Sequence, residues 1–135
     1  MPLKYLLDTN TVSYLLSGRE PRVRLRMERA GFAATSISAV TEAELRYGLA
    51  KKQPSIRLRI AVETFLAQAA ILPWDSAAAA AYGLLRAGQE RKGRPRSAED
   101  LMIAAQAFSR GLILVTRDHA FSFVDGLRME DWTAA

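Results

Sequence analysis

The sequence that decides the fold is YLLDTN, at residues 5–10. The short apolar run Tyr5–Leu7 is typical of a strand that is buried on both faces of a parallel sheet. Asp8 follows this run directly, and in open parallel sheets ligands bind beyond the carboxyl ends of the strands. Asp8 is therefore well placed to bind a ligand. The alternative is that Asp8 or Asn10 caps a helix that begins here, and the residues alone favour neither role.

The rest of the chain alternates short apolar runs with longer helical patterns, which favours a parallel sheet covered by helices. We expect further strands at 33–37, 70–73 and 112–115, and a short last one within 126–132. We expect helices at 11–16, from residue 21, and at 40–52, 54–68, 75–91 and 97–110. Residues 92–96, which include a glycine and a proline, form a loop. At 135 residues the chain has the length of one domain, 1–135.

The composition excludes several kinds of site. The chain has no cysteine, which excludes disulfides and thiolate metal ligands, and its one histidine excludes a His-rich zinc site. No apolar stretch approaches the roughly 18 residues of a membrane span, and the N-terminal apolar run is too short for a signal peptide. We therefore expect a cytoplasmic protein that has no membrane partner.

The charge balance points to a polyanionic partner. The formal net charge is +5, from 19 basic and 14 acidic residues, and the sequence pI is near 10.0. If several acids gather in one pocket, the remaining surface is more basic than the total indicates. A basic surface around an acidic pocket suits a nucleic acid. The alternative is a basic protein that has no such partner.

A second acid stands beyond the run LILV at residues 112–115, which is the clearest strand in the sequence. This acid is Asp118. It converges with Asp8 if the two strands are neighbours in the sheet, because the carboxyl ends of parallel strands meet at one edge. A role as a cap or turn residue is the alternative.

Asp100 belongs to a helix whose pattern predicts its direction. The residues three, four, seven and eight positions later are all apolar, namely Ile103, Ala104, Ala107 and Phe108. We therefore expect Asp100 to point into the protein. Glu99 shares a face with Gln106 and Arg110, so we expect that face to be exposed. A capping interaction with Ser97 also fits the spacing and would itself orient the Asp100 carboxylate.

A fourth acid is harder to choose. Glu42 and Glu44 lie two residues apart and therefore on opposite sides of a predicted helix. Glu44 aligns with Val40 and Tyr47, and Glu42 aligns with Leu45. Because both faces carry apolar residues, the spacing favours Glu44 only weakly. An exposed place on the helix surface is the alternative for either glutamate.

Four carboxylates gathered in one pocket need a compensating charge. Packed together they repel one another, and their burial is costly unless a cation is present. Hard oxygen ligands on Mg²⁺ or Mn²⁺ are the usual apparatus of phosphodiester chemistry. The sequence therefore predicts a divalent metal site built from acids.

Five short segments of the chain occur in the order found in PIN domains, and the chain resembles the VapC ribonuclease toxins of VapBC toxin–antitoxin pairs. The segments are LLDTN at 6–10, ELRYG at 44–48, DLMIAA at 100–105, LVTRD at 114–118 and GLRMEDW at 126–132. Each segment is weak alone, but five in register over nearly the whole chain are specific. The resemblance implies a three-layer α/β/α fold on a mainly parallel central sheet.

The resemblance also implies which residues form the site. The acids of the implied quartet, which would hold Mg²⁺ or Mn²⁺, are Asp8, Glu44, Asp100 and Asp118. The family pattern thereby selects Glu44 over Glu42. Asn10 and Thr116 match polar positions that support the pocket. One departure lies at Asp118, where many relatives carry asparagine or have a slightly longer loop.

The implied activity is metal-dependent endoribonuclease cleavage, inhibited by a small VapB-like antitoxin. The implied assembly is a homodimer or a toxin–antitoxin hetero-oligomer. Four cations precede the helix of Asp100, where phosphate contacts would position RNA. They are Arg91, Lys92, Arg94 and Arg96. An ordinary solvated loop is the alternative for this basic segment.

Two other functions compete with the nuclease. A non-catalytic RNA-binding or partner-binding α/β module, whose acids are only caps, would show neither cleavage nor a metal-dependent change in melting temperature. An aspartate-dependent phosphatase forms an aspartyl-phosphate at the acid after its first strand. Such a phosphatase needs a second aspartate two residues on, where this chain has Asn10.

Overall fold

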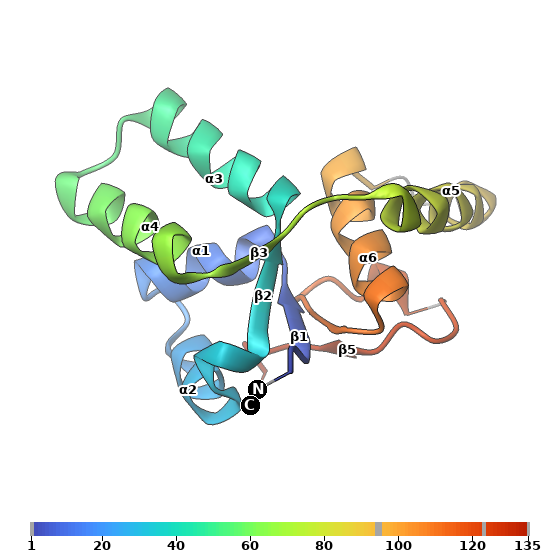
Figure 1. The fold of residues 1–135 in the computed structure, drawn as a ribbon, viewed down its shortest axis with the longest axis horizontal. Helices are drawn as coiled ribbons and strands as arrows, with labels where there is room; N and C mark the ends of the chain where they lie inside the picture. Colours follow the sequence, from blue (N-terminus) through green and yellow to red (C-terminus); the bar gives the residue numbers. More distant parts are fainter. Residues whose placement is uncertain (1, 94–95, 123, 135) are drawn as a thin grey trace.

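The computed structural model describes residues 2–93, 96–122 and 124–134. Within these residues, five parallel strands form one sheet in the order β3-β2-β1-β4-β5, with helices on both faces (Figure 1). The strands are β1 (Tyr5–Leu7), β2 (Thr35–Ser38), β3 (Ala70–Leu72), β4 (Ile113–Val115) and β5 (Met129–Glu130). The helices are α1 (Thr9–Ser17), α2 (Pro21–Ala30), α3 (Ala39–Lys52), α4 (Ile56–Gln68), α5 (Ser76–Arg91) and α6 (Ala98–Arg110), and the 3₁₀ turns are η1 (Phe32–Ala34) and η2 (His119–Phe121).

The central strand β1 separates two hydrophobic cores. Leu6 packs into a core with α5 and α6, whereas Leu7 packs into a core with helices α1 to α4. Successive side chains of a strand point to opposite faces of the sheet, and both faces are covered by helices here (Figure 1). Burial on both sides explains why β1 and β4 are apolar, whereas β2 buries the hydroxyl side chains of Thr35, Ser36 and Ser38. The three-layer α/β/α fold expected from the sequence is confirmed.

The strand register brings the ends of β1, β2 and β4 to one edge of the sheet. Leu7, the last residue of β1, pairs with Ile37 on β2 and with Val115 on β4. The first strand and the strand at 112–115 are neighbours in the sheet, which is the condition for Asp8 and Asp118 to converge. The residues that follow β1 and β4 must lie close together in space.

Several elements begin one or two residues from the expected position, among them the first helix and the second strand. The first helix starts at Thr9 rather than Thr11, because Asp8 occupies its N-cap position and accepts a hydrogen bond from the Thr11 amide at 2.8 Å. The second strand starts at Thr35 rather than at residue 33. The turn η1 precedes it, and Thr35 Oγ1 donates to the Phe32 carbonyl oxygen at 2.8 Å.

The expectation that the face of α6 carrying Glu99 and Gln106 is exposed is wrong for Gln106. This side chain is buried, and its Nε2 atom donates to the Pro73 carbonyl oxygen at 2.8 Å. The segment after β3 lies against α6, and its carbonyl groups need a donor once they are removed from water. No helix in the described part of the chain is long and apolar enough to span a membrane.

Candidate active site

Asp8 lies at the carboxyl end of β1, where it is largely buried. Its carboxylate accepts hydrogen bonds from the Thr11 amide and from the side chain of Thr116, which follows β4. Burial raises the pKa of Asp8 above its ordinary value, the bonds from Thr116 and Thr11 oppose this rise, and the nearby Asp100 carboxylate adds to it. Asp8 is both a helix cap and a member of an acidic group, so its role as a cap leaves the predicted ligand role open.

Three of the four expected acids line one small cavity. The cavity has a volume of about 40 Å³ and is lined by Asp8, Asp100 and Asp118, together with Asn10 and Thr116. Its apolar wall consists of Ile103, Leu114 and Phe121. A space of this size holds on the order of two or three water-sized spheres. The cavity therefore has room for a small ion and very little else.

Asp100 reaches this cavity from the first turn of α6. Ser97 caps the helix, and its Oγ atom accepts a hydrogen bond from the Asp100 amide at 3.1 Å. The residue is exposed as a whole, although it lines the cavity wall. Asp100 therefore points toward the cavity, as expected, but it is not buried in the protein interior. The capping geometry fixes the direction in which the carboxylate leaves the helix.

Glu44 lies beside the cavity and not on its wall. The Thr9 hydroxyl donates a hydrogen bond to Glu44 Oε1, which ties the glutamate to the start of α1. Burial raises the pKa of Glu44, and the carboxylates of Asp100, Glu99 and Asp8 add to the rise, while the bond from Thr9 opposes it. These influences place Glu44 within electrostatic reach of the cavity acids.

Glu42 lies in different surroundings from Glu44. Its Oε2 atom accepts a hydrogen bond from Arg46 Nε at 3.1 Å, as an i,i+4 ion pair on the surface of α3. The sequence could not separate the two glutamates by spacing, and the structure separates them by their partners. Thr9, which donates the hydrogen bond to Glu44, directly follows Asp8 in the sequence. This position next to a candidate site acid is the sequence feature that could have identified Thr9 as a site residue.

Asp118 follows β4 and caps η2. Its Oδ1 atom accepts a hydrogen bond from the Ala120 amide at 2.9 Å, and its own amide donates to Thr116 Oγ1 at 3.0 Å. Its Oδ2 atom lies 3.2 Å from Arg96 Nε. The backbone contacts explain how the loop after β4 turns its acid toward the end of β1.

The donor atoms of the cavity suit a hard cation. Asp8, Asp100 and Asp118 offer carboxylate oxygens and Asn10 offers an amide oxygen, which are the ligand types of Mg²⁺ and Mn²⁺. Among the residues that the structure describes, however, no three acidic or imidazole side chains are close enough together to hold an ion as they stand. The donor chemistry therefore fits, and side-chain adjustment is needed to bring the oxygens together.

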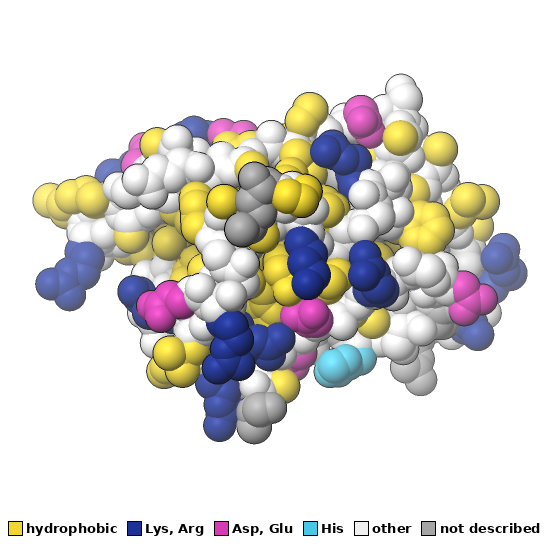
Figure 2. All heavy atoms as spheres, turned by 60° about the horizontal axis from the view of Figure 1, so that its bottom comes forward, with side chains coloured by type: hydrophobic (Ala, Val, Ile, Leu, Met, Phe, Trp, Pro, Cys, Tyr) yellow, Lys and Arg dark blue, Asp and Glu magenta, His cyan; other side chains and the backbone are white. Residues whose placement is uncertain are grey.

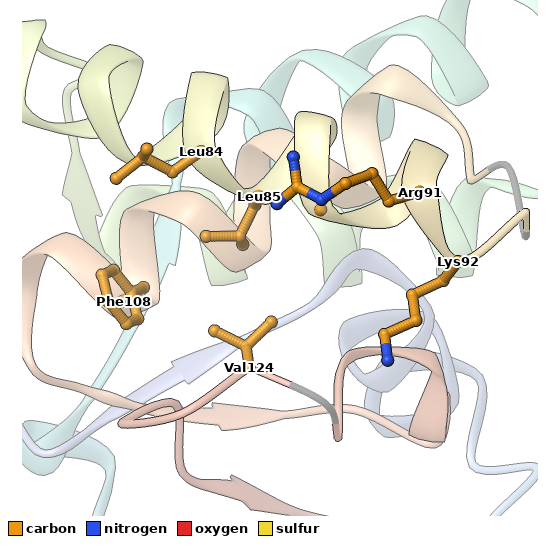
Figure 3. A pocket seen from close by; sticks show the side chains of 7 residues that line it. Leu84, Leu85, Arg91, Lys92, Phe108 and Val124 are labelled. Carbon is orange, nitrogen blue, oxygen red and sulfur yellow. The ribbon is translucent and has the colours of Figure 1, made fainter.

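The four cations of the expected RNA-positioning segment do not share one place. Arg96 contacts Asp118, whereas Arg94 lies outside the described residues. Arg91 and Lys92 are exposed, and Figure 3 shows them beside a different pocket. The other residues lining that pocket include Leu84, Leu85, Phe108 and Val124. On the face drawn in Figure 2, Lys and Arg side chains are spread among acids instead of forming one continuous patch.

The comparisons with known proteins agree with this fold. The PIN domain family model matches residues 5–127. The chain is 41% identical over 132 residues to the tRNA(fMet)-specific endonuclease VapC of Shigella flexneri, covering 97% of this chain and 99% of the relative. It is 37% identical to Ribonuclease VapC2 of Haemophilus influenzae, with 96% and 98% of the two chains covered.

Solved structures give the same result. The chain superposes on the DNA-bound VapBC of Salmonella typhimurium with a TM-score of 0.82 and 36% identity, covering 96% of this chain and 98% of the other. For VapBC2 of Rickettsia felis bound to a promoter DNA fragment, the TM-score is 0.84 and the identity 27%, with 98% and 99% covered. The chain therefore belongs to the PIN-domain family and, within it, to the VapC ribonucleases.

Proposed function

We propose that this chain is a cytoplasmic, metal-dependent endoribonuclease toxin. Its active site, formed by the carboxylates of Asp8, Glu44, Asp100 and Asp118, cleaves RNA phosphodiesters. The observation that carries the proposal is the single small cavity lined by Asp8, Asp100 and Asp118 at the ends of two neighbouring strands. Burial of Asp8 without a cation is costly, as its raised pKa indicates. A bound Mg²⁺ or Mn²⁺ ion would neutralise the scissile phosphate and acidify a water molecule.

The residues around the acids serve to hold them in place. Thr116 and the Thr11 amide direct the Asp8 carboxylate, and Thr9 directs Glu44. Asn10 stands exposed on the cavity wall, where its side chain can contact RNA or the ion. Positioned acids need less reorganisation when the charge of the reaction develops, which is the main source of catalysis at such sites.

The names of two relatives indicate which RNA to test first. Because curated relatives are named tRNA(fMet)-specific endonucleases, tRNA(fMet) is the first RNA to test. Arg91, Lys92, Arg94 and Arg96 precede α6 and would contact phosphates on either side of the cut. Such contacts fix the place of the chain on the RNA without reading its sequence.

A VapB-like antitoxin is the partner that we propose for the groove between α1, α3 and α4. The groove has a volume of about 370 Å³, and Glu44 lies on its wall. Its apolar lining includes Leu16, Leu45, Leu49, Leu58 and Val62. An apolar segment of the antitoxin could fill this groove and direct a basic side chain toward Glu44. The resulting toxin–antitoxin hetero-oligomer would either replace a homodimer of the toxin or contain one.

The decisive experiment is RNA cleavage by the purified protein. A pool of cellular RNA and isolated tRNA(fMet) are incubated with the protein in Mg²⁺, in Mn²⁺ and in EDTA, and the new ends are mapped. We expect cleavage with either ion, none in EDTA, and none from the Asp8→Asn or Asp100→Asn variants. Cleavage that persists in EDTA would disprove the metal dependence. Binding of RNA without any cleavage would favour the non-catalytic module.

A further inference from the structure

Arg96 contacts the acidic cavity from a neighbouring element of the chain. It directly precedes the Ser97 cap of α6, and its Nε atom lies 3.2 Å from Asp118 Oδ2. The rest of its surroundings form a second small pocket of about 150 Å³, whose other lining residues include Tyr82, Arg86, Gln89 and Leu101. Arg96 thus stands between this pocket and the cavity of Asp8, Asp100 and Asp118.

Both carboxylate oxygens of Asp118 have partners in this arrangement. Oδ1 accepts from the Ala120 amide at 2.9 Å, and Oδ2 faces Arg96. A metal ion that takes Oδ2 as a ligand therefore competes with Arg96 for this oxygen, because the two cations repel each other at so short a distance. The backbone bond to Oδ1 can stay, because it serves the cap of η2.

The ion pair between Arg96 and Asp118 is readily broken. The two side chains are 32% and 37% exposed, so water screens their attraction. Although the atoms are close, the buried Nε–H of Arg96 forms no hydrogen bond of normal geometry with any residue that the structure describes. The contact is therefore an ion pair without the directional bond that would lock it, and little is lost when Arg96 leaves.

We propose that Arg96 is a resident counter-cation of this site, which competes with a divalent ion for the Asp118 carboxylate and contacts substrate phosphate once it is released. The inference rests on the proposed function and deepens it. Without an ion, Arg96 offsets part of the negative charge of the cavity. With an ion at Asp118, the guanidinium is repelled and turns toward the phosphate beside the cut, for which its planar donors are suited. Arg96 is thus a positioning residue that couples metal binding to RNA binding.

The test is a Mn²⁺ titration of the metal-free full chain by calorimetry, without RNA. Removing the competing cation in Arg96→Gln should tighten Mn²⁺ binding by about two- to fivefold, the range of a half-exposed ion pair. Arg96→Lys should stay near the wild type because it keeps the charge. The matched control is Arg86→Gln, since Arg86 lines the same second pocket but pairs with Glu90 on α5. It loses the same charge and should bind Mn²⁺ as the wild type does.

A double-mutant cycle places the effect on Asp118. In an Asp118→Asn background, Arg96→Gln should change Mn²⁺ affinity by less than it does alone, because the shared carboxylate is gone. Equal or weaker Mn²⁺ binding by Arg96→Gln than by the wild type overturns the inference and leaves the proposed function intact. No Mn²⁺ binding by the wild type overturns both.

The second half of the inference is tested by kinetics with RNA at saturating Mn²⁺. Loss of a phosphate contact should raise KM in Arg96→Gln by several-fold more than it lowers kcat. Arg96→Lys should recover part of this loss, because an ammonium contacts phosphate as a point charge. An unchanged KM in Arg96→Gln overturns the phosphate contact.

Discussion

Thr9 Oγ1 donates a hydrogen bond to Glu44 Oε1 and so joins the first turn of α1 to the second turn of α3. The same hydroxyl lies 3.1 Å from Thr41 Oγ1, one turn earlier on α3. Glu42 lies on another side of α3, where it pairs with Arg46. The bond from Thr9 therefore decides which of the two glutamates is held next to Asp8.

Replacing Thr9 by valine should shift the acid limb of the pH–rate profile to higher pH. The bond from Thr9 lowers the pKa of Glu44 against the rise caused by burial. Without this donor the pKa rises further, so a higher pH is needed to ionise the acid. The measurement is kcat/KM for RNA cleavage between pH 5 and 9, with Thr64→Val on the exposed side of α4 as the control. An unshifted acid limb would show that the ionisation of Glu44 does not set this limb.

Asp8→Asn should stabilise the metal-free protein at neutral pH. Burial raises the pKa of Asp8 in the folded state, so the stability that its protonated form provides is present below the unfolded pKa and lost as pH rises through the folded pKa. Asparagine stays neutral and caps a helix as well as aspartate does. Melting temperatures in EDTA should therefore be higher for Asp8→Asn than for the wild type at pH 7, and should converge in acid.

The Asp8→Ala variant distinguishes the effect of the helix cap on stability from the effect of the buried charge. Alanine removes the same buried charge but also the hydrogen bond to the Thr11 amide, and loss of an N-cap costs about 1 kcal/mol. The alanine variant should therefore melt below Asp8→Asn at every pH. If the two variants melt alike, the capping bond contributes nothing to stability.

Mg²⁺ or Mn²⁺ should raise the melting temperature of the wild type. An ion that binds only the folded state stabilises it by about 2.7 kcal/mol at a concentration 100-fold above its Kd. The rise should be smaller or absent in Asp100→Asn, because Asp100 lines the cavity. Asp125→Asn, which removes an exposed acid away from the cavity lining, should respond as the wild type does. An equal response in all three proteins would place the ion elsewhere.

Gly48→Leu should weaken antitoxin binding without harming the fold. A Cβ atom at Gly48 would meet no described atom within 4 Å outside its own helix and neighbours, and the residue lies on the wall of the groove between α1, α3 and α4. Leucine would fill the groove and favour the helix by up to about 1 kcal/mol relative to glycine. Co-purification with a co-expressed VapB-like antitoxin is the measurement.

Gly83→Leu is the matched control for that experiment. Gly83 lies within α5, and a Cβ atom there would likewise meet no described atom within 4 Å, but Gly83 is not part of the groove lining. It should gain helix stability in the same way and keep the antitoxin. If Gly48→Leu also keeps the antitoxin, the partner binds at another surface.

The fold was largely readable from local pattern. The apolar runs of β1 and β4 and the cap Ser97 appear where the sequence predicts them. These signals act over a few residues, through hydrogen bonds to free amides and through burial of one face. They also placed Asp8 and Asp118 beyond the ends of two strands.

Partners distant in sequence were not readable in this way. The exposed face predicted for Glu99 and Gln106 is wrong at Gln106, because the backbone after β3 covers it. Spacing could not separate Glu44 from Glu42, because both faces of α3 are apolar. The contact of Arg96 with Asp118 joins residues 22 positions apart.

The sequence by itself determined the alternation of strands and helices, the family, and the acids that stand at strand and helix ends, because each of these depends on short-range periodicity and on residue type. Only the tertiary structure decided which side chains share a cavity, which glutamate a threonine holds, and which arginine faces the fourth acid. The reason is physical: burial and ion pairing depend on distances between elements, and the packing of α1, α3 and α6 around β1 sets those distances.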